Sequence, residues 1–302
     1  MNVKEQAKLI VNNRKKVAEE NQRTFLESLR KDAVFDQLCF NLNSKKWNYV
    51  KSVSQQQKED ALREIEENEK AIVSYLESKG LGAESIKPKY FCKKCNDTGE
   101  IDGKECECIK TLVQEIVYKE NPLLKEGGEN LSGIDFDFYG EEKDIKRKYA
   151  EYLDKTMSGG EKAYYLLVGK TGTAKTYIAL TALKQEFIKG RSVKAISSIK
   201  LNKSFLNYHC ARIENKDALW QEIAGADVML IDDLGVEQLL NNVTVPYLYE
   251  LLIDRLDKVT FITTNLDVIE LEKRYGQRIL SRLLDKKLST AINFKGKDLR
   301  FN

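Results

Sequence analysis

Hydrophobic residues change their spacing along the chain near residue 134. Before it, a polar segment with sparse apolar positions at about 4–31 and a segment at about 55–79, where apolar residues recur every three or four positions, predict two helices. After it, short apolar runs alternate with helical patterns. These runs predict strands at 163–168, 192–197, 227–232, 259–264 and 288–294. Strands that alternate with helices indicate an α/β fold, with a parallel sheet covered by helices on both faces.

A weakly patterned, glycine-containing stretch at about 120–135 lies between the two patterns, and we interpret it as a linker. It divides the chain into a mainly helical N-terminal domain, 1–130, and an α/β domain, 131–302. A chain of 302 residues is long enough for each domain to bury its own core. The two N-terminal helices could pack within their domain, form a coiled coil or bind a partner helix. Packing within the domain is the simplest interpretation.

Charge and composition narrow the class of protein without identifying it. Lys and Arg total 50 against 47 Asp and Glu, so the net charge of +3 excludes a strongly basic coat for nucleic acid but allows a local basic groove. The N-terminal sequence lacks an apolar signal core, and no run of about 18 apolar residues occurs. We therefore expect a cytoplasmic protein that is neither exported nor inserted in a membrane.

A phosphate-binding loop is predicted where the first strand of the α/β domain ends, in the sequence YLLVGKTGTAKT that closes with Lys175 and Thr176. Gly169 and Gly172 have no Cβ, so the backbone can turn there and point its N–H groups at a polyphosphate. Lys175 is expected to reach the β and γ phosphates of ATP, and the Thr176 hydroxyl to bind Mg²⁺. A glycine-rich turn with a chance Lys-Thr pair is the alternative.

The loop departs at one position from the pattern G-x-x-x-x-G-K-[ST], because Ala174 stands where the last glycine is expected. One methyl group is a small obstruction, so we expect it to affect the rate of hydrolysis more than nucleotide binding. The residues expected to bind ATP or ADP form one continuous segment: Gly169, Lys170, Thr171, Gly172, Thr173, Ala174, Lys175, Thr176 and Tyr177.

Polar residues follow two later strands, at positions that a parallel sheet would bring to the same edge. Asp232 and Asp233 end the apolar run at 227–232; the first is expected to hold Mg²⁺ through water, and the second to polarise the attacking water. Many ATPases use glutamate for the second task, so Glu237 is a further candidate base. Asn265 ends the next strand and is expected to contact the γ-phosphate or the water. A helix cap or a turn is the structural alternative.

Four of the six cysteines lie close together and follow the spacing C-x₂-C-x₁₀-C-x-C. They are Cys92, Cys95, Cys106 and Cys108. In a reducing compartment such a cluster indicates metal ligation, and four thiolates suit one tetrahedral Zn²⁺ ion. Gly99 and Gly103 would let the chain return as a tight hairpin within a zinc element at 90–109. A redox dithiol is the alternative, although four ligands would leave no open catalytic position.

Taken together, these motifs resemble the AAA+ module of bacterial and phage replicative-helicase loaders of the DnaC/DnaI type. The resemblance spans roughly residues 134–302 and includes Tyr275–Leu283, in which Arg278 and Arg282 lie one helical turn apart. It implies that Arg282 is an arginine finger for a neighbouring subunit and that Arg300 is a second nucleotide sensor. A solvated basic face is the alternative for Arg278 and Arg282.

Loaders of this type also resemble the N-terminal half, where a cysteine-rich zinc element joins a helical region to the ATPase. The resemblance implies an ATPase with a P-loop AAA+ sheet that uses ATP, Mg²⁺ and Zn²⁺. It further implies that the N-terminal region holds a hexameric DnaB-type helicase and that the protein loads this helicase onto single-stranded DNA. Copies bound to ATP would associate as a homo-oligomer, and hydrolysis would release the loader.

The sequence is also compatible with two other functions. An IstB-type transposition helper shares the ATPase core but generally lacks the cysteine element. A non-hydrolysing adaptor or inhibitor that binds a helicase is compatible with Ala174 and the Asp-Asp pair. For DNA contact, the candidates are basic side chains beside an aromatic ring: Lys200, Lys203, Arg212, Phe205 and Tyr208. The single histidine, His209, is expected to be structural.

Overall fold

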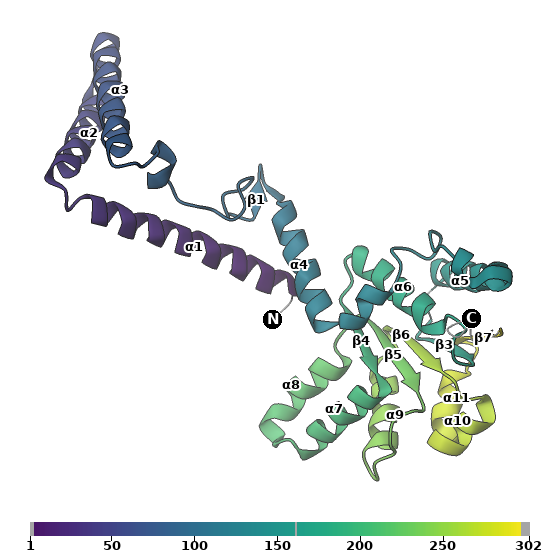
Figure 1. Cartoon of the computed structure of the whole chain (residues 1–302). Helices are drawn as coiled ribbons and strands as arrows, with labels where there is room; N and C mark the ends of the chain where they lie inside the picture. The colour runs from purple at the N-terminus through teal and green to yellow at the C-terminus, as the bar shows by residue number, and fades with distance from the viewer. Residues whose placement is uncertain (1–2, 161, 297–302) are drawn as a thin grey trace. The chain divides into compact units, whose positions relative to one another are not determined.

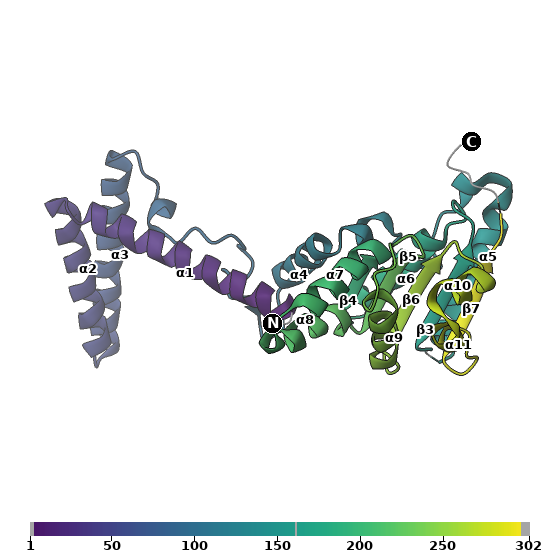
Figure 2. The ribbon, with the colours of Figure 1, turned by 90° about the horizontal axis from the view of Figure 1, so that it is seen from below.

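A computed structural model describes residues 3–160 and 162–296 of the chain (Figures 1 and 2). The chain forms two compact units, whose boundary lies between Ile116 and Val117. Each unit has hydrophobic clusters of its own. Within the described residues, no helix combines the length and the apolar character that a membrane span requires.

Helices make up most of the first unit (Figure 1). Its elements are α1 (Val3–Leu29), α2 (Ala33–Lys51), α3 (Gln55–Ser78), the 3₁₀ helix η1 (Ala83–Ile86), the strands β1 (Glu100–Ile101) and β2 (Lys104–Glu105), and most of α4 (Glu107–Glu120). The predicted helices at 4–31 and 55–79 are confirmed as α1 and α3. The hydrophobic pattern does not predict α2, because its apolar side chains lie on several faces: Phe35 is buried, whereas Phe40 and Trp47 are exposed.

The helices α2 and α3 pack against each other as a hairpin (Figure 1). Phe35 of α2 is buried against Ile72 and Leu76 of α3. Asn68, a buried polar residue of α3, donates a hydrogen bond to the carbonyl oxygen of Leu38 at 2.9 Å. The apolar stripe of α3 is therefore used for packing within the unit, as the simplest interpretation expected.

The second unit is a parallel sheet of five strands with flanking helices (Figure 2). Its strands are β3 (Tyr164–Gly169), β4 (Val193–Ser197), β5 (Val228–Leu234), β6 (Val259–Thr264) and β7 (Ser289–Phe294). They lie in the order β4-β5-β6-β3-β7, and every neighbouring pair is parallel. All five predicted strands and the predicted parallel sheet are confirmed.

Helices precede the first of these strands and connect the others. They are η2 (Pro122–Glu126), η3 (Asp137–Glu142), α5 (Lys143–Ser158), α6 (Lys175–Ile188), α7 (Ser198–Cys210), α8 (Ile213–Ala224), α9 (Thr244–Asp254), α10 (Val268–Tyr275) and α11 (Gln277–Leu283). The strand segments 164–167 and 228–231 are fully buried, as expected for central strands covered on both faces. Because β6 lies between β3 and β5, the carboxyl ends of all three strands meet at one edge of the sheet.

The segment interpreted as a linker, 120–135, is docked on the second unit instead. The side chain of Asn121 accepts a hydrogen bond from the Ala195 amide in β4 at 2.8 Å. The Gly128 amide donates to the Thr181 hydroxyl in α6 at 2.9 Å. One bond thus joins a side chain of the segment to the backbone of β4, and the other joins the backbone of the segment to a side chain of α6. The two units accordingly divide before residue 117, earlier than the predicted division after residue 130.

Candidate nucleotide site and cysteine cluster

The phosphate loop connects the end of β3 to the start of α6. Gly169 approaches β7 so closely that a Cβ there would lie 2.3 Å from the carbonyl oxygen of Phe294, so only glycine fits. Gly172 has a φ of 77°, and Ala174, the residue that caps α6, has a φ of 72°. Ala174 therefore adopts the left-handed conformation that the glycine of the usual pattern adopts without strain.

Lys175 lies at the centre of the loop and is almost fully buried. Its Nζ donates hydrogen bonds to the carbonyl oxygens of Gly169 at 2.6 Å and Lys170 at 2.8 Å. A third bond, of 2.9 Å, goes to the side-chain oxygen of Asn265 at the end of β6. The structure thus brings together two residues, Lys175 and Asn265, that lie far apart in the sequence and were both predicted to face the phosphates.

Asp232 is joined to the loop on its other side. Its Oδ1 accepts hydrogen bonds from the Thr176 hydroxyl at 2.8 Å and from the Thr263 hydroxyl at 2.7 Å. A hydroxyl and a carboxylate in contact are oxygen donors of the kind that Mg²⁺ prefers, so these residues fit the predicted ion. Thr263 was not assigned a role from the sequence, and its place two residues before Asn265 in the same strand is the signal that could have found it.

Asp233 lies at an irregularity in the sheet. The register between β5 and β6 shifts between Ile231 and Leu234, and Asp233 has a φ of 52°. Its backbone N–H donates to the Thr263 hydroxyl at 2.8 Å. A bulge of this kind re-aims side chains next to a site, so the two adjacent carboxylates do not follow the regular alternation of a strand.

Glu237 is committed elsewhere, which corrects the expectation that it could replace Asp233 as a base. Its carboxylate is buried, accepts a hydrogen bond from the Gly235 amide at 2.9 Å and another from the Tyr275 hydroxyl, and lies 3.5 Å from the Arg274 guanidinium. Burial raises the pKa of Tyr275, and the Glu237 hydrogen bond raises it further. The structure gives Glu237 a structural role between β5 and α10.

Arg282 lies on α11 and contacts α9 of its own chain. Its Nη2 donates to the Tyr249 hydroxyl at 3.0 Å, and this hydrogen bond lowers the pKa of Tyr249. A groove of about 810 Å³ lies beside it, lined in part by Arg278, Tyr249 and Pro246. Arg282 therefore engages α9 and not the phosphate loop of the same chain. Arg300, the expected second sensor, lies outside the described residues.

The aromatic residues considered for DNA contact differ in exposure. Phe205 is fully buried in the core beside Trp220, so it cannot stack on a base, and that expectation is wrong. Tyr208 is half-buried and packs on Trp220 and Tyr247. The His209 Nδ1 lies 2.9 Å from the Tyr247 hydroxyl, a contact consistent with its expected structural role.

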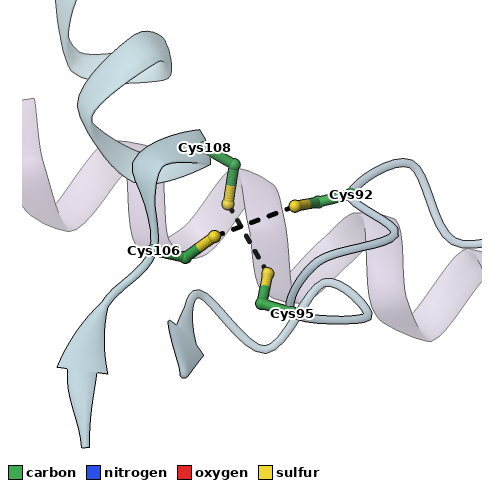
Figure 3. Close-up of side chains that lie close together, drawn as sticks. All are labelled: Cys92, Cys95, Cys106 and Cys108. Carbon is green, nitrogen blue, oxygen red and sulfur yellow. Dashed lines mark hydrogen bonds between the residues drawn. The ribbon is translucent and has the colours of Figure 1, made fainter. Parts of the chain in front are cut away.

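The four clustered cysteines converge on one point (Figure 3). The Sγ atoms of Cys92 and Cys106 are 3.8 Å apart, those of Cys95 and Cys108 are 3.6 Å apart, and all four lie within 4.8 Å of one another. These separations are too long for disulfides, which span about 2.05 Å. Zn–S bonds of about 2.3 Å in a tetrahedron separate the sulfur atoms by about 3.8 Å, so the cluster fits a zinc ion.

Local turns hold the cluster together. The strands β1 and β2 form an antiparallel hairpin whose turn residues, Asp102 and Gly103, both have positive φ, as the predicted tight return requires. Asp97, which no sequence motif singled out, is buried and accepts hydrogen bonds from the Cys92 and Phe91 amides, both at 2.8 Å. It fixes the turn that carries the first two cysteines.

The thiols of the cluster influence one another. Burial alone would raise the pKa of the Cys95 thiol, but the Gly99 amide and the neighbouring thiols lower it to about 7. Burial raises the pKa of the Cys108 thiol, and the neighbouring thiols raise it further. A cluster with one thiol that deprotonates readily is suited to begin metal ligation, because thiolates are the ligands.

The sheet order and the loop define the class of protein. A strand inserted between the loop strand β3 and the acidic strand β5, with a Lys-Thr pair at the start of α6, is the P-loop architecture of the AAA+ type that the motifs resemble. Residues 129–301 match the sequence model of the family described as IstB-like ATP binding protein. The chain belongs to this IstB-like ATP-binding family.

Individual proteins show weaker similarity. The replicative helicase loader DnaC of Escherichia coli (strain K12) is 24% identical over 140 residues, which cover 45% of this chain and 54% of the relative, and DnaC of Shigella flexneri gives the same values. The chain thus spans about half the length of these curated relatives.

Solved structures are also similar. The crystal structure of DnaI has a TM-score of 0.42 and 22% identity, with 59% of this chain and 93% of that chain covered. The crystal structure of the DnaC helicase loader has a TM-score of 0.45 and 20% identity, covering 55% of this chain and 97% of that chain.

Proposed function

We propose that this chain is an ATP-dependent loader that delivers a DnaB-type replicative helicase to single-stranded DNA. One observation carries the proposal: a P-loop ATP-binding module and a separate helical unit with a four-cysteine cluster occur in one chain. The curated relatives named above are replicative helicase loaders. Their similarity reaches only about half of their length, so the loading activity of this chain is an inference.

The nucleotide chemistry follows from the contacts at the sheet edge. Lys175 would exchange its loop carbonyls for the phosphates of ATP, while Asn265 stays close to the γ-phosphate. Thr176 and Asp232 would hold Mg²⁺, which offsets the phosphate charge when bound. Asp233 would orient and polarise the attacking water. Arg282, which contacts Tyr249 beside the groove that Arg278 lines, would serve the nucleotide of a neighbouring copy in a homo-oligomer.

The helicase would be held by the first unit. Three apolar side chains of α2 are exposed to solvent, by 66% for Phe40, 60% for Trp47 and 72% for Val50. Exposed aromatic side chains that cluster on one element are typical of the anchors of protein interfaces. We propose that the helicase covers this α2 strip, defined by Phe40, Trp47 and Val50, and that Zn²⁺ bound at the four cysteines stiffens the segment that follows α3.

Co-purification of the full chain with the replicative helicase tests the partner. Trp47→Ser is expected to weaken capture by about 30-fold or more, since anchor residues contribute about 2 kcal/mol or more. Ile213→Ser is the matched control, because Ile213 is 82% exposed in the second unit. If the wild-type chain does not capture the helicase, the partner assignment is wrong and only an ATPase is left.

A transposition helper is the second candidate, and the family match favours it because the matched family carries the IstB name. That match begins at residue 129 and leaves the cysteine cluster unexplained. We therefore prefer the loader. Capture of a transposase in place of a helicase would reverse the preference.

A non-hydrolysing adaptor is the remaining alternative. ATP turnover, measured with and without single-stranded DNA, tests it, because an adaptor of this kind would show no turnover under either condition.

A further inference from the structure

We propose that a groove between α1 and the zinc element binds single-stranded nucleic acid, with a base stacked on the ring of Phe91. The groove has a volume of about 440 Å³ and lies entirely within the first unit. Small-ligand sites occupy roughly 300–1,000 Å³, so a nucleotide fits this space. The groove shares no residue with the ATP site or the α2 strip, and the inference does not depend on the loader proposal.

Phe91 is presented to solvent on a rigid support. Its side chain is 74% exposed, although it directly precedes Cys92 of the cluster. Its amide donates to the buried carboxylate of Asp97, which also binds the Cys92 amide, so the backbone beneath the ring is fixed. The guanidinium carbon of Arg14 lies 4.1 Å from the ring centre. An exposed ring beside an arginine is the combination on which unpaired bases stack.

The charges around the ring favour a polyanion. Lys89 lines the groove, and Lys93 lies two residues after Phe91 in the sequence; both are exposed, and neither forms an ion pair with another described residue. Asp97, the acid that lines the groove, is buried and accepts hydrogen bonds from two backbone amides. Glu19, the nearby acid of α1, is engaged by Lys15 at 3.9 Å and by the Tyr90 hydroxyl at 3.4 Å. These two lysines are therefore available for phosphates spaced along a strand.

The remaining wall of the groove can meet the edges of bases. Asn13 and Asn21 line it from α1, and each amide side chain offers both donors and an acceptor. Val17, between them, contributes an apolar surface that is 58% exposed. A protein partner would be better served by several exposed apolar side chains, such as those of the α2 strip. The mixture of one ring, available cations and amides points to single strands instead.

Fluorescence anisotropy with the full, zinc-loaded chain tests the groove, without ATP and without helicase. The probes are oligothymidylate and oligouridylate of about 20 nucleotides, longer than the roughly 4–16 nucleotides that one such site covers. Phe91→Ala is expected to weaken binding of at least one probe by about 5- to 100-fold. Phe91→Trp should restore it, and Ile213→Ala, a change at a similarly exposed apolar residue of the second unit, should leave it unchanged.

Further variants distinguish binding in the groove from attraction of the probe to basic side chains elsewhere on the chain. Lys89→Ala and Lys93→Ala should each reduce the slope of log affinity against log salt by about 0.7 per lost phosphate contact. Zinc content and thermal melting of each variant establish that the element is still folded. Crosslinks from bromouracil-substituted oligothymidylate should map to the peptide that contains Phe91.

Two outcomes would overturn the inference: unchanged affinity of folded Phe91→Ala for both probes, or crosslinks confined to α7 near Lys200 and Lys203. Helicase capture by the same variants keeps the two proposals distinguishable. Phe91→Ala is expected to capture helicase as the wild-type chain does. If the wild-type chain does not capture helicase, the loader proposal is wrong, but the proposed nucleic-acid groove is unaffected.

Discussion

The cysteine cluster draws its four side chains from one short segment, whereas the nucleotide site draws its own from the ends of three strands. Cys92 and Cys108 lie sixteen positions apart in sequence, while Lys175 and Asn265, which share a hydrogen bond, are separated by 90. The cluster is held by a local hairpin and by Asp97. The nucleotide site exists only when β6 lies between β3 and β5.

This difference has a chemical counterpart. The four sulfur atoms lie within 4.8 Å of one another, and two pairs already have the separation of a tetrahedral zinc site, so one ion would complete the cluster. In the nucleotide site, Lys175 bonds Asn265 and Asp232 accepts a bond from Thr176, so the two buried charged groups already have hydrogen-bond partners. ATP and Mg²⁺ would therefore have to exchange existing hydrogen bonds. We expect changes in the cluster to affect folding, and changes in the nucleotide site to affect activity.

Loss of the metal should have the largest effect. Structural zinc contributes about 10–16 kcal/mol of apparent binding energy that is also folding energy, so Cys95→Ser or chelation should unfold residues 90–109. Hydrogen exchange should show this unfolding, while ATP affinity of the second unit is retained. Cys39→Ser is the control, because Cys39 is a half-buried cysteine outside the cluster. One bound zinc per chain in Cys95→Ser would contradict the closed site.

Arg282→Ala should have the next largest effect, and only on hydrolysis. An arginine finger contributes about 1,000-fold or more to turnover, and Arg282 contacts Tyr249 away from its own phosphate loop. ATP binding should be unchanged, and Arg278→Ala should reduce turnover by less than about tenfold. Mixing Arg282→Ala with Lys175→Ala should restore part of the activity, because one copy supplies the loop and the other the arginine. No recovery in the mixture would argue against action between copies.

Asp233→Asn should reduce turnover by about 100- to 10,000-fold, the range for a general base, and leave ATP binding intact. Glu237→Gln is the informative comparison, because Glu237 is buried against Tyr275 and Gly235. It should lower the thermal stability of the second unit but leave turnover within about tenfold of wild type. The reverse result, a stable and inactive Glu237→Gln chain, would make Glu237 the base.

Much of the fold could be predicted because its strands are continuous apolar runs. Segments 164–167 and 228–231 are buried on both faces, and burial on both faces leaves a signal in composition alone. The helix α2 could not be predicted in the same way. It buries Phe35 but exposes Phe40 and Trp47, so it has no single apolar stripe.

The candidate site was predictable where a residue type and a strand end coincide, as for Asp232 and Asn265. It was not predictable where tertiary contacts decide. Thr263 bonds both Asp232 and the Asp233 amide, and although its place before Asn265 could have marked it as a candidate, only the pairing of β5 with β6 gives it these contacts. Phe205 precedes exposed residues in sequence but faces the core. A sequence pattern therefore locates polar residues at strand ends better than it locates residues whose role depends on tertiary contacts.

Ala174→Gly should have the smallest effect. It tests whether the phosphate loop of the nucleotide site contains backbone strain, which the hairpin of the cysteine cluster avoids by having glycine at position 103. Ala174 has a φ of 72° and a ψ of 10°, a conformation that costs a residue with a Cβ about 1–2 kcal/mol. Glycine removes that cost but adds about 0.4–1 kcal/mol of chain entropy to the unfolded state. The free energy of unfolding of the second unit should therefore rise by about 0–1.6 kcal/mol. Denaturant unfolding, monitored by the fluorescence of a bound nucleotide, measures this change. Gly172→Ala, at a φ of 77°, should lose a similar amount. If Ala174→Gly instead lowered stability, or raised turnover more than about tenfold, the methyl group would be acting on the bound phosphates and not through backbone strain.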